Sequence, residues 1–478
     1  MTQTNTIEFG TDGIRGVAGE FPLDPATVLQ IGRAIGVWLQ RTGTYNARVL
    51  IGRDTRISGQ MLAAALSAGL LAEGVQVADS GIISTPGVAH LTRSNNFALG
   101  IVISASHNPF EQNGIKLFGA NGFKLDDAAE EAIETLISQP NVEAAHGIGT
   151  LTTFDGREKY IAHLIEGIDL RSLSVVLDCA NGAAFEMAPQ AFRRAGATVH
   201  TINTQCDGYS INVSAGSEHV RRDRNTLVAE VQQHGADLGV AFDGDADRVI
   251  FVTPDGMLID GDHVLGILAL ELQAQEDLPG ATVVATDMSN SGLEHFLAEH
   301  GIRLSRTKVG DRYVMERLRE QGYRLGGEQA GHIIILDSDH TAGDGIFAAL
   351  YTAHIVAGKK RSGGATLAQL AAQIPRYPQV IASAHLKARI ELSKVEGLKE
   401  ATDATLARFE GKGRVNLRFS GTEPNLLRAM VEGGAHNTLQ QTIDAALQLC
   451  SLVAKATHTE NPQVDMVDCV TGEPIHLG

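Results

Sequence analysis

Short runs of apolar, often β-branched residues alternate with longer amphipathic segments over the first 150 residues or so. Short apolar runs are typical of buried strands, and apolar positions that recur every three or four residues are typical of helices. Asp24 and Pro25 supply an N-cap and a first-turn proline for one helix. The pattern predicts strands at 47–52, 75–79 and 97–104, and helices at 25–40 and 58–73. Such alternation indicates an α/β domain.

The same alternation begins again twice further along the chain, and a smaller region follows. The predicted elements are strands at 174–178, 198–202 and 238–243 with a helix at 185–195, then a strand at 282–286, a helix at 292–299, a strand leading to Lys308 and a long helix at 344–356, and finally strands at 415–419 and 427–432. The predicted fold class is therefore α/β, with three similar mixed-sheet domains and a smaller C-terminal α+β domain.

Breaks in this pattern divide the chain into four domains and a tail. The predicted domains are residues 1–156, 157–258, 259–370 and 371–456, and the tail is 457–478. The segment PRYP at 375–378 has the composition of a linker into the last domain. Because the tail lacks hydrophobic periodicity, we expect it to be loosely ordered and dispensable for chemistry.

Charge and composition narrow the classes of partner. The formal net charge of −17 over 478 residues argues against a nucleic-acid partner. An anionic substrate must then be bound by a local cluster of arginines. No apolar run is long enough to span a membrane, and the first residues do not resemble a secretory signal. The four cysteines form no CxxC motif, so we expect reduced thiols in a cytoplasmic protein.

The segment SASHNP, residues 104–109, follows the apolar strand predicted at 97–104. Ligands of open α/β sheets bind at the carboxyl ends of strands, which is where this loop should lie. Ser106, His107 and the nearby Lys116 are residue types that a phosphoryl-transfer site could use. Taken alone, the segment is equally consistent with an ordinary polar turn.

A second polar loop, DGDADR at 243–248, follows another apolar strand. Its carboxylates at Asp243, Asp245 and Asp247 alternate and could converge on one hard cation such as Mg²⁺. The loop does not fit an EF-hand, because Arg248 stands where that motif needs glycine. The alternative is a solvated acidic turn. Three close carboxylates repel one another unless something neutralises them, which favours the metal site.

These two segments occur in order with GGEQAGH (326–332) and SGTEP (420–424). Together the four resemble the motifs of the α-D-phosphohexomutase superfamily. The opening FGTDGIRG (9–16) and the GGEQ form of the third motif are most similar to the branch of phosphoglucosamine mutases. The resemblance covers nearly the whole chain and implies four domains in a heart shape around a central cleft.

The resemblance also implies a mechanism. Ser106 is expected to be phosphorylated in the resting enzyme, and the three aspartates with the Ser106 phosphate are expected to bind one Mg²⁺. A sugar 1,6-bisphosphate would be the intermediate and activator. Lys116 and His332 are candidates for proton transfer, and His107 is expected to order the loop. Transfer through Lys116 needs a lowered pKa, which the nearby Arg15 and Arg248 could provide; Arg15 is also a candidate phosphate ligand.

The remaining motifs are expected to bind the substrate. The expected sugar and phosphate ligands are Lys308, Gly310, Glu328, Gln329, Arg418, Ser420, Gly421, Thr422 and Arg428. Glu328 could accept two sugar hydroxyls or pair with an ammonium group. The superfamily often has serine where Ala330 stands, so one hydroxyl contact is missing here. The segment from Pro424 to Arg428 is one residue longer than usual, which makes Arg418 the firmer of the two arginine assignments.

The expected reaction is the interconversion of glucosamine 6-phosphate and glucosamine 1-phosphate by a monomer or homodimer. A phosphomannomutase or phosphoglucomutase would share the same machinery and is the nearest alternative. A phosphatase, in which water takes the phosphoryl group, would release inorganic phosphate. A sugar-phosphate sensor would bind without turnover, but it need not keep Ser106 and the metal loop together.

Overall fold

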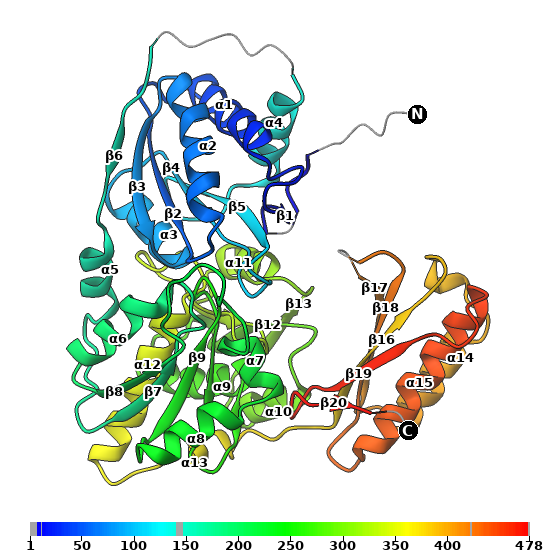
Figure 1. Cartoon of the computed structure of the whole chain (residues 1–478). Coiled ribbons are helices and arrows are strands. Elements are labelled where there is room, and N and C mark those ends of the chain that lie inside the picture. The colour runs from blue at the N-terminus through cyan, green and yellow to red at the C-terminus, as the bar shows by residue number, and fades with distance from the viewer. Residues whose placement is uncertain (1–6, 11, 140–146, 421–422, 477–478) are drawn as a thin grey trace.

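The computed structural model describes the chain except residues 1–6, 11, 140–146, 421–422 and 477–478. Figure 1 shows four units, with the first above the second and third, and the fourth to one side. Within the described part of the chain, no helix combines the length and apolar character needed to cross a bilayer.

The first unit is a six-stranded mixed sheet with helices on both faces. Its elements are β1 (Ile14–Val17), α1 (Pro25–Arg41), β2 (Arg48–Arg53), α2 (Gly59–Ala72), β3 (Gln76–Ile82), α3 (Thr85–Ser94), β4 (Leu99–Ile103), β5 (Gln112–Gly119), α4 (Asp127–Ile137) and β6 (Leu151–Thr153). Along β2, Val49 and Ile51 face the core under α1, α2 and α4, while Leu50 faces the core that includes α3. This alternation follows from the two-residue repeat of a strand. As predicted, Asp24 caps α1 by accepting from two backbone N–H groups of its first turn.

The second and third units are built in the same way. The elements of the second are α5 (Arg157–Leu164), β7 (Ser174–Asp178), α6 (Ala184–Arg194), β8 (Thr198–Ile202), α7 (Gly216–Arg222), α8 (Asn225–Gln233), β9 (Leu238–Phe242), β10 (Val249–Val252) and β11 (Leu258–Ile259). Those of the third are α9 (Gly261–Ala274), η1 (Pro279–Ala281), β12 (Thr282–Thr286), α10 (Ser291–Glu299), β13 (Arg303–Thr307), α11 (Asp311–Gln321), β14 (Leu325–Gly327), β15 (Ile333–Ile335), α12 (Gly345–Arg361) and α13 (Leu367–Ala371). The helix predicted at 344–356 begins at Gly345 in the structure and ends later than predicted, at Arg361.

One strand order recurs in all three units. The neighbouring strands are β3-β2-β4-β5 in the first, β8-β7-β9-β10 in the second and β13-β12-β14-β15 in the third. In each unit the first strand of the set lies parallel to the second and third, and the fourth is antiparallel to the third. The prediction of three similar mixed-sheet domains is therefore confirmed. One hydrophobic core runs through the second and third units and into the α3 face of the first.

The fourth unit has a separate core and a five-stranded antiparallel sheet. Its elements are β16 (Gln379–His385), η2 (Leu392–Lys394), α14 (Leu398–Arg408), β17 (Arg414–Phe419), β18 (Leu426–Glu432), α15 (Leu439–Ala456), β19 (Val464–Asp468) and β20 (Pro474–Ile475). The chain enters this unit through residues 375–378, which are neither helix nor strand, as the linker prediction requires.

The expectation of a loosely ordered tail is wrong. β19 pairs with β16 over five residue pairs and so lies inside the sheet rather than beside it. Met466, at the centre of β19, is buried in the core of the fourth unit. Two aspartates interrupt the apolar residues of β19, so it lacks the short apolar run that makes a strand visible in the sequence, and only its pairing with β16 makes it recognisable.

Candidate active site

Equivalent loops from the first three units meet at one place. In each unit the loop joins the third strand of the shared order to the fourth, at the carboxyl end of the third strand. Backbone hydrogen bonds connect the units there: Thr85 N donates to Asp245 O at 3.0 Å, and Val249 N donates to Gly331 O at 2.9 Å. An isolated antiparallel bridge pairs Arg248 with His332. The repeated topology therefore brings three motifs together that lie far apart in sequence.

Ser106 lies at the centre of this junction in a backbone conformation that few side-chain-bearing residues adopt. Its φ is +52°, in the left-handed region. Its N–H donates to Ser104 Oγ at 2.9 Å, and its own hydroxyl donates to Asp243 Oδ2 at 2.5 Å. The ring of His107 approaches the same hydroxyl, with Nδ1 at 3.4 Å from Oγ. The turn thus directs the hydroxyl of Ser106 at the acidic loop of the second unit.

A buried arginine holds this turn, and the sequence analysis did not find it. The guanidinium of Arg56 donates to the carbonyl oxygens of Ser106 and Asn108, both at 2.8 Å, and to two further carbonyls of the loop, those of Pro109 and Gln112. Asp54 in turn accepts from Arg56 Nε at 2.9 Å and from Ser104 Oγ at 2.5 Å. Both side chains are completely buried. The signal was present, because the polar residues DTR (54–56) follow the carboxyl end of β2 just as SASHNP follows β4.

Asp243, Asp245 and Asp247 converge as predicted. One oxygen from each lies within 4.8 Å of the others, and all three residues are buried. Burial and the two neighbouring carboxylates raise the pKa of Asp243 well above its ordinary value. Among the described side chains, Oδ1 of Asp245 and Oδ1 of Asp247 are buried without a hydrogen-bond partner. Crowded carboxylates with unpartnered oxygens fit a hard divalent cation, which prefers oxygen ligands.

Lys116 is buried beside these carboxylates, and its environment corrects one expectation. Its Nζ lies 2.9 Å from Asp245 Oδ2 and 3.0 Å from Asp12 Oδ2. Burial by itself would lower the pKa of Lys116, but Asp12, Asp245 and Asp247 outweigh it and raise the pKa, and Arg15 opposes them only in part. The expectation that neighbouring cations lower this pKa is therefore wrong, because the carboxylates are closer. Lys116 is therefore held as an ammonium group that carries a proton, but its raised pKa makes it a weaker acid than a free lysine.

The predicted residues Arg15, His107 and Arg248 border the same place. Arg15 Nη1 donates to Ala105 O at 3.2 Å, next to Ser106. Burial, and after it the charges of Arg248 and Arg15, lowers the pKa of His107 to about 4. His107 is therefore neutral at pH 7. The backbone N–H of Arg248 donates to Asp243 Oδ1 at 3.2 Å, so the arginine also fixes the acidic loop.

The third unit brings Glu328, Gly310 and His332 to the junction. Glu328 Oε1 accepts from Gly310 N at 3.2 Å, and burial raises the pKa of the Glu328 carboxyl. His332 Nε2 lies 4.0 Å from Asp247 Oδ2 and 3.9 Å from Asp311 Oδ2. Gly343 packs against this ring so closely that a Cβ there would lie 2.2 Å from it.

Two other predicted residues of the third unit lie differently. The ammonium group of Lys308 lies 5.8 Å from the centre of the Tyr313 ring. The amide of Gln329 is buried and donates to Gln379 Oε1 at 3.3 Å and to Cys469 O at 3.4 Å. Gln329 therefore joins the third unit to the fourth, and its expected contact with substrate stays a prediction.

The fourth unit presents a cluster of arginines. Arg418 and Arg428 are directly opposite each other on β17 and β18, so their side chains share one face of the sheet. Burial and the charge of Arg428 lower the pKa of Arg418. Arg389, which the sequence analysis missed, donates to the backbone carbonyl of Ser420. Gly421 and Thr422 lie outside the described residues. Such a concentration of guanidinium groups suits a phosphate.

Among the described residues, the fourth unit forms hydrogen bonds with the second and third units. Arg414 Nη2 donates to Ser289 O at 2.6 Å, and Arg224 Nη1 donates to Thr471 O at 3.0 Å. Figure 1 shows β17 and β18 to one side of β12 and β13 of the third unit, below the sheet of the first unit. The junction of the three loops is therefore assembled without the fourth unit, whose arginines form a separate part of the candidate site.

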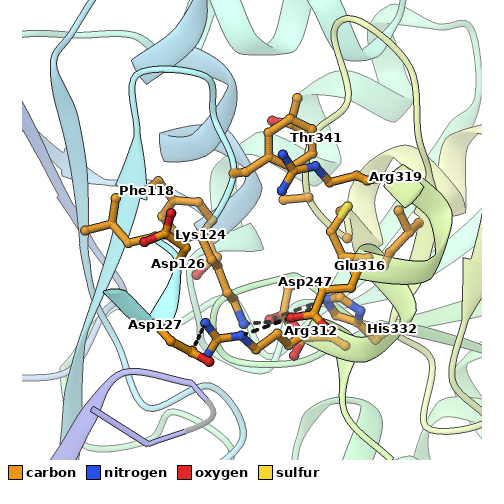
Figure 2. A pocket seen from close by; sticks show the side chains of 18 of the residues that line it. Phe118, Lys124, Asp126, Asp127, Asp247, Arg312, Glu316, Arg319, His332 and Thr341 are labelled. Atoms are coloured by element: carbon orange, nitrogen blue, oxygen red, sulfur yellow. Dashed lines mark hydrogen bonds and ion pairs between the residues drawn. The ribbon is translucent and has the colours of Figure 1, made fainter. Parts of the chain in front are cut away.

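A cavity of 440 Å³ opens beside this junction, between the first and third units. Figure 2 shows Asp247 and His332 on one side of it, and Lys124 and Arg312 reaching into it from the two units. Phe118, Leu125, Met315 and Ile334 form an apolar wall.

Comparison with known families matches all four units in order. The models are the phosphoglucomutase/phosphomannomutase α/β/α domains I (residues 6–143), II (158–256) and III (260–377) and the C-terminal domain (384–448).

Curated relatives and solved structures agree with these matches. A phosphoglucosamine mutase of Methylobacillus flagellatus is 45% identical over 89% of this chain and 94% of its own length. One of Deinococcus deserti is 46% identical over 89% of this chain and 93% of its own.

A phosphoglucomutase/phosphomannomutase family protein of Burkholderia thailandensis superposes with a TM-score of 0.77 at 26% identity, over 92% of this chain and 97% of its own. The N-acetylphosphoglucosamine mutase of Aspergillus fumigatus, solved in complex with GlcNAc-6P and magnesium, has the same fold at a TM-score of 0.66 and 16% identity, over 95% of this chain and 96% of its own. The chain belongs to the phosphoglucomutase/phosphomannomutase family of the α-D-phosphohexomutase superfamily, and within it to the phosphoglucosamine mutases.

Proposed function

We propose that this protein is a Mg²⁺-dependent mutase that interconverts glucosamine 6-phosphate and glucosamine 1-phosphate through a phosphorylated Ser106. The observation that carries the proposal is the hydroxyl of Ser106 at 2.5 Å from Asp243, inside a cluster of buried carboxylates. Relatives of 42–46% identity over most of the chain bear the name of this activity, which supports the choice of sugar.

The carboxylates of Asp243, Asp245 and Asp247 and a phosphate on Ser106 would hold the cation. Bound there, Mg²⁺ would neutralise charge on the phosphoryl group while it is transferred. The unpartnered oxygens of Asp245 and Asp247 support this assignment. So does the magnesium in the fungal complex of the same fold.

The residues of this chain would then move one phosphoryl group in each direction. A hydroxyl of the sugar monophosphate attacks phosphorus, the bond from phosphorus to Ser106 Oγ breaks, and a sugar bisphosphate forms. The attacking hydroxyl loses a proton, for which His332 Nε2 is the candidate acceptor. Oγ gains a proton, for which the ammonium of Lys116 is the candidate donor. After the bisphosphate turns around, the other phosphoryl group returns to Ser106 by the reverse step.

The third and fourth units would hold the substrate during this exchange. Glu328, fixed by Gly310 N, would accept hydroxyl groups of the sugar or pair with its ammonium group. Arg418 and Arg428, with Arg389 nearby, would bind the phosphate that is not transferred. A cytoplasmic location and a monomeric or dimeric state stay predictions.

The test is turnover by the purified protein, with Mg²⁺ and a trace of bisphosphate, on glucosamine, glucose and mannose 6-phosphates side by side. We expect glucosamine 6-phosphate to dominate. A preference for glucose or mannose phosphate would overturn the choice of sugar and leave the phosphoserine mechanism intact. Release of inorganic phosphate in step with sugar consumption would instead indicate a phosphatase.

A further inference from the structure

Lys124 connects the first unit to the third at the candidate site, and none of the motifs includes it. It lies in the loop between β5 and α4, where a backbone bridge to Phe118 fixes its position. Its Nζ lies 2.7 Å from Asp12 Oδ1 in the first unit and 2.7 Å from Asp311 Oδ2 at the start of α11 in the third. One ammonium group therefore binds carboxylates of two units at hydrogen-bond distance.

Each of these carboxylates faces one of the two proton-transfer candidates. Asp12 Oδ2 lies 3.0 Å from Lys116 Nζ, and Asp311 Oδ2 lies 3.9 Å from His332 Nε2. The chain of contacts runs from Lys116 through Asp12, Lys124 and Asp311 to His332, and it crosses the boundary between the units once, at Lys124. In Figure 2 the side chain of Lys124 extends across the cavity toward Asp247 and His332.

The charge balance shows what Lys124 does in this chain. Burial alone would lower its pKa, but Asp12 and Asp311 outweigh burial and raise it, so Lys124 remains a cation. Without this cation, Asp12 and Asp311 would be two close carboxylates that repel each other. Asp311 would then move away from Asp12, and His332 would lose the fixed charge beside its ring. We propose that Lys124 is a positioning residue that holds Lys116 and His332 in a fixed position relative to each other across the boundary between the first and third units.

The inference rests on the proposed mutase function, and the chain supplies a matched control. Arg312, one residue after Asp311 on α11, forms ion pairs across the same boundary with Asp127 and Glu130 on α4. Its side chain is 21% exposed, close to the 26% of Lys124. Among the described residues, Arg312 forms ion pairs with Asp127, Glu130 and Glu316, and with neither proton-transfer candidate. If Lys124 only joined two units, loss of Arg312 should have a similar effect.

The experiment compares Lys124→Met, Lys124→Arg and Arg312→Met in the full chain, with thermal unfolding as the check on folding. We expect Lys124→Met to lower kcat for glucosamine 6-phosphate about 10- to 100-fold with little change in KM, as for a displaced catalytic group. Lys124→Arg should restore part of the loss, and Arg312→Met should turn over near the wild-type rate. An unchanged kcat in Lys124→Met, or an equal loss in Arg312→Met, would overturn the proposal.

A second measurement does not depend on turnover. In protein labelled with ¹⁵N at histidine rings, the His332 signal is identified by its disappearance in His332→Gln. We expect Lys124→Met to shift this signal and Arg312→Met to leave it in place. An unchanged His332 signal in Lys124→Met would refute the positioning role, whether or not the sugar assignment is correct. If Lys124→Met does not fold, Asp311→Asn breaks the same chain on the His332 side and must give the same shift and loss of kcat.

Discussion

Replacement of Arg56 by methionine tests how the loop of Ser106 is held. The guanidinium donates to four carbonyl oxygens of that loop, including those of Ser106 and Asn108 at 2.8 Å, and pairs with the buried Asp54. Methionine fills similar space but donates nothing. The variant therefore leaves four carbonyl groups without this donor and one carboxylate buried without its cation.

The size of the effect can be worked from these contacts. Hydrogen bonds to a charged group contribute about 1.5–3 kcal/mol each, and removing one partner of a buried ion pair costs about 3–5 kcal/mol. Water and rearrangement of the loop recover part of this. If about 3 kcal/mol falls on the conformation that directs Ser106 at Asp243, the competent fraction and hence kcat should fall about 100-fold.

The assay measures kcat with glucosamine 6-phosphate and the phosphorylated fraction of Ser106 by intact-protein mass spectrometry. Arg53→Met is the matched control. Arg53 is the last residue of β2, and its Nη1 donates to Asp79 Oδ1 on β3 at 2.7 Å. In the sheet, β3 lies on one side of β2, and β4, which leads into the loop of Ser106, lies on the other. Wild-type turnover in a folded Arg56→Met variant would refute the reasoning. So would an equal loss in Arg53→Met, because the effect would then not act through the loop.

Three further predictions follow from the site and the fold. Asp245→Asn should lose most activity and need more Mg²⁺, and an unchanged metal requirement in a metal titration would place the cation elsewhere. Burial raises the pKa of Glu130 to about 7, with the charge of Asp127 acting in the same direction and that of Arg312 in the opposite one. The native state therefore binds this proton more tightly than the unfolded state, and stability falls as pH rises from about 4.5 to 7. Solvent screening at this partly exposed carboxyl reduces the effect, so Glu130→Gln should gain about 1–2 kcal/mol at pH 8 and little at pH 4 in urea unfolding; equal gains at both pH values would contradict this. Deletion of residues 458–478 should lower the unfolding midpoint of the fourth unit, because it uncovers one edge of β16 and removes Met466 from the core; an unchanged midpoint would mean that β19 contributes nothing.

Much of the site could be predicted from the sequence for a local reason. An apolar strand followed by a polar loop places that loop at the edge of a sheet, and this rule drew attention to the loops of Ser106 and the three aspartates. The resemblance to the superfamily's motifs then singled out Ser106 as the residue expected to be phosphorylated. The chemistry of the residue types then predicted the rest: crowded carboxylates need a cation, and guanidinium groups bind phosphate. The strands at 174–178 and 282–286 were predicted to the residue, because each centres on a short apolar run.

Tertiary structure decided what depends on groups distant in sequence. The pKa of Lys116 is set by Asp12 and two aspartates of another unit, so its direction could not be inferred from neighbouring motifs. β19 is a strand because β16 is beside it, and Arg56 matters because its donors reach a loop about fifty residues away. The bridge from Asp12 through Lys124 to Asp311 exists only once two units are packed together. The sequence by itself determined which groups could do the chemistry and at which strand ends they lie, since both follow from local pattern. Only the fold decided which charges face one another, because an electrostatic interaction depends on distance in space and not along the chain.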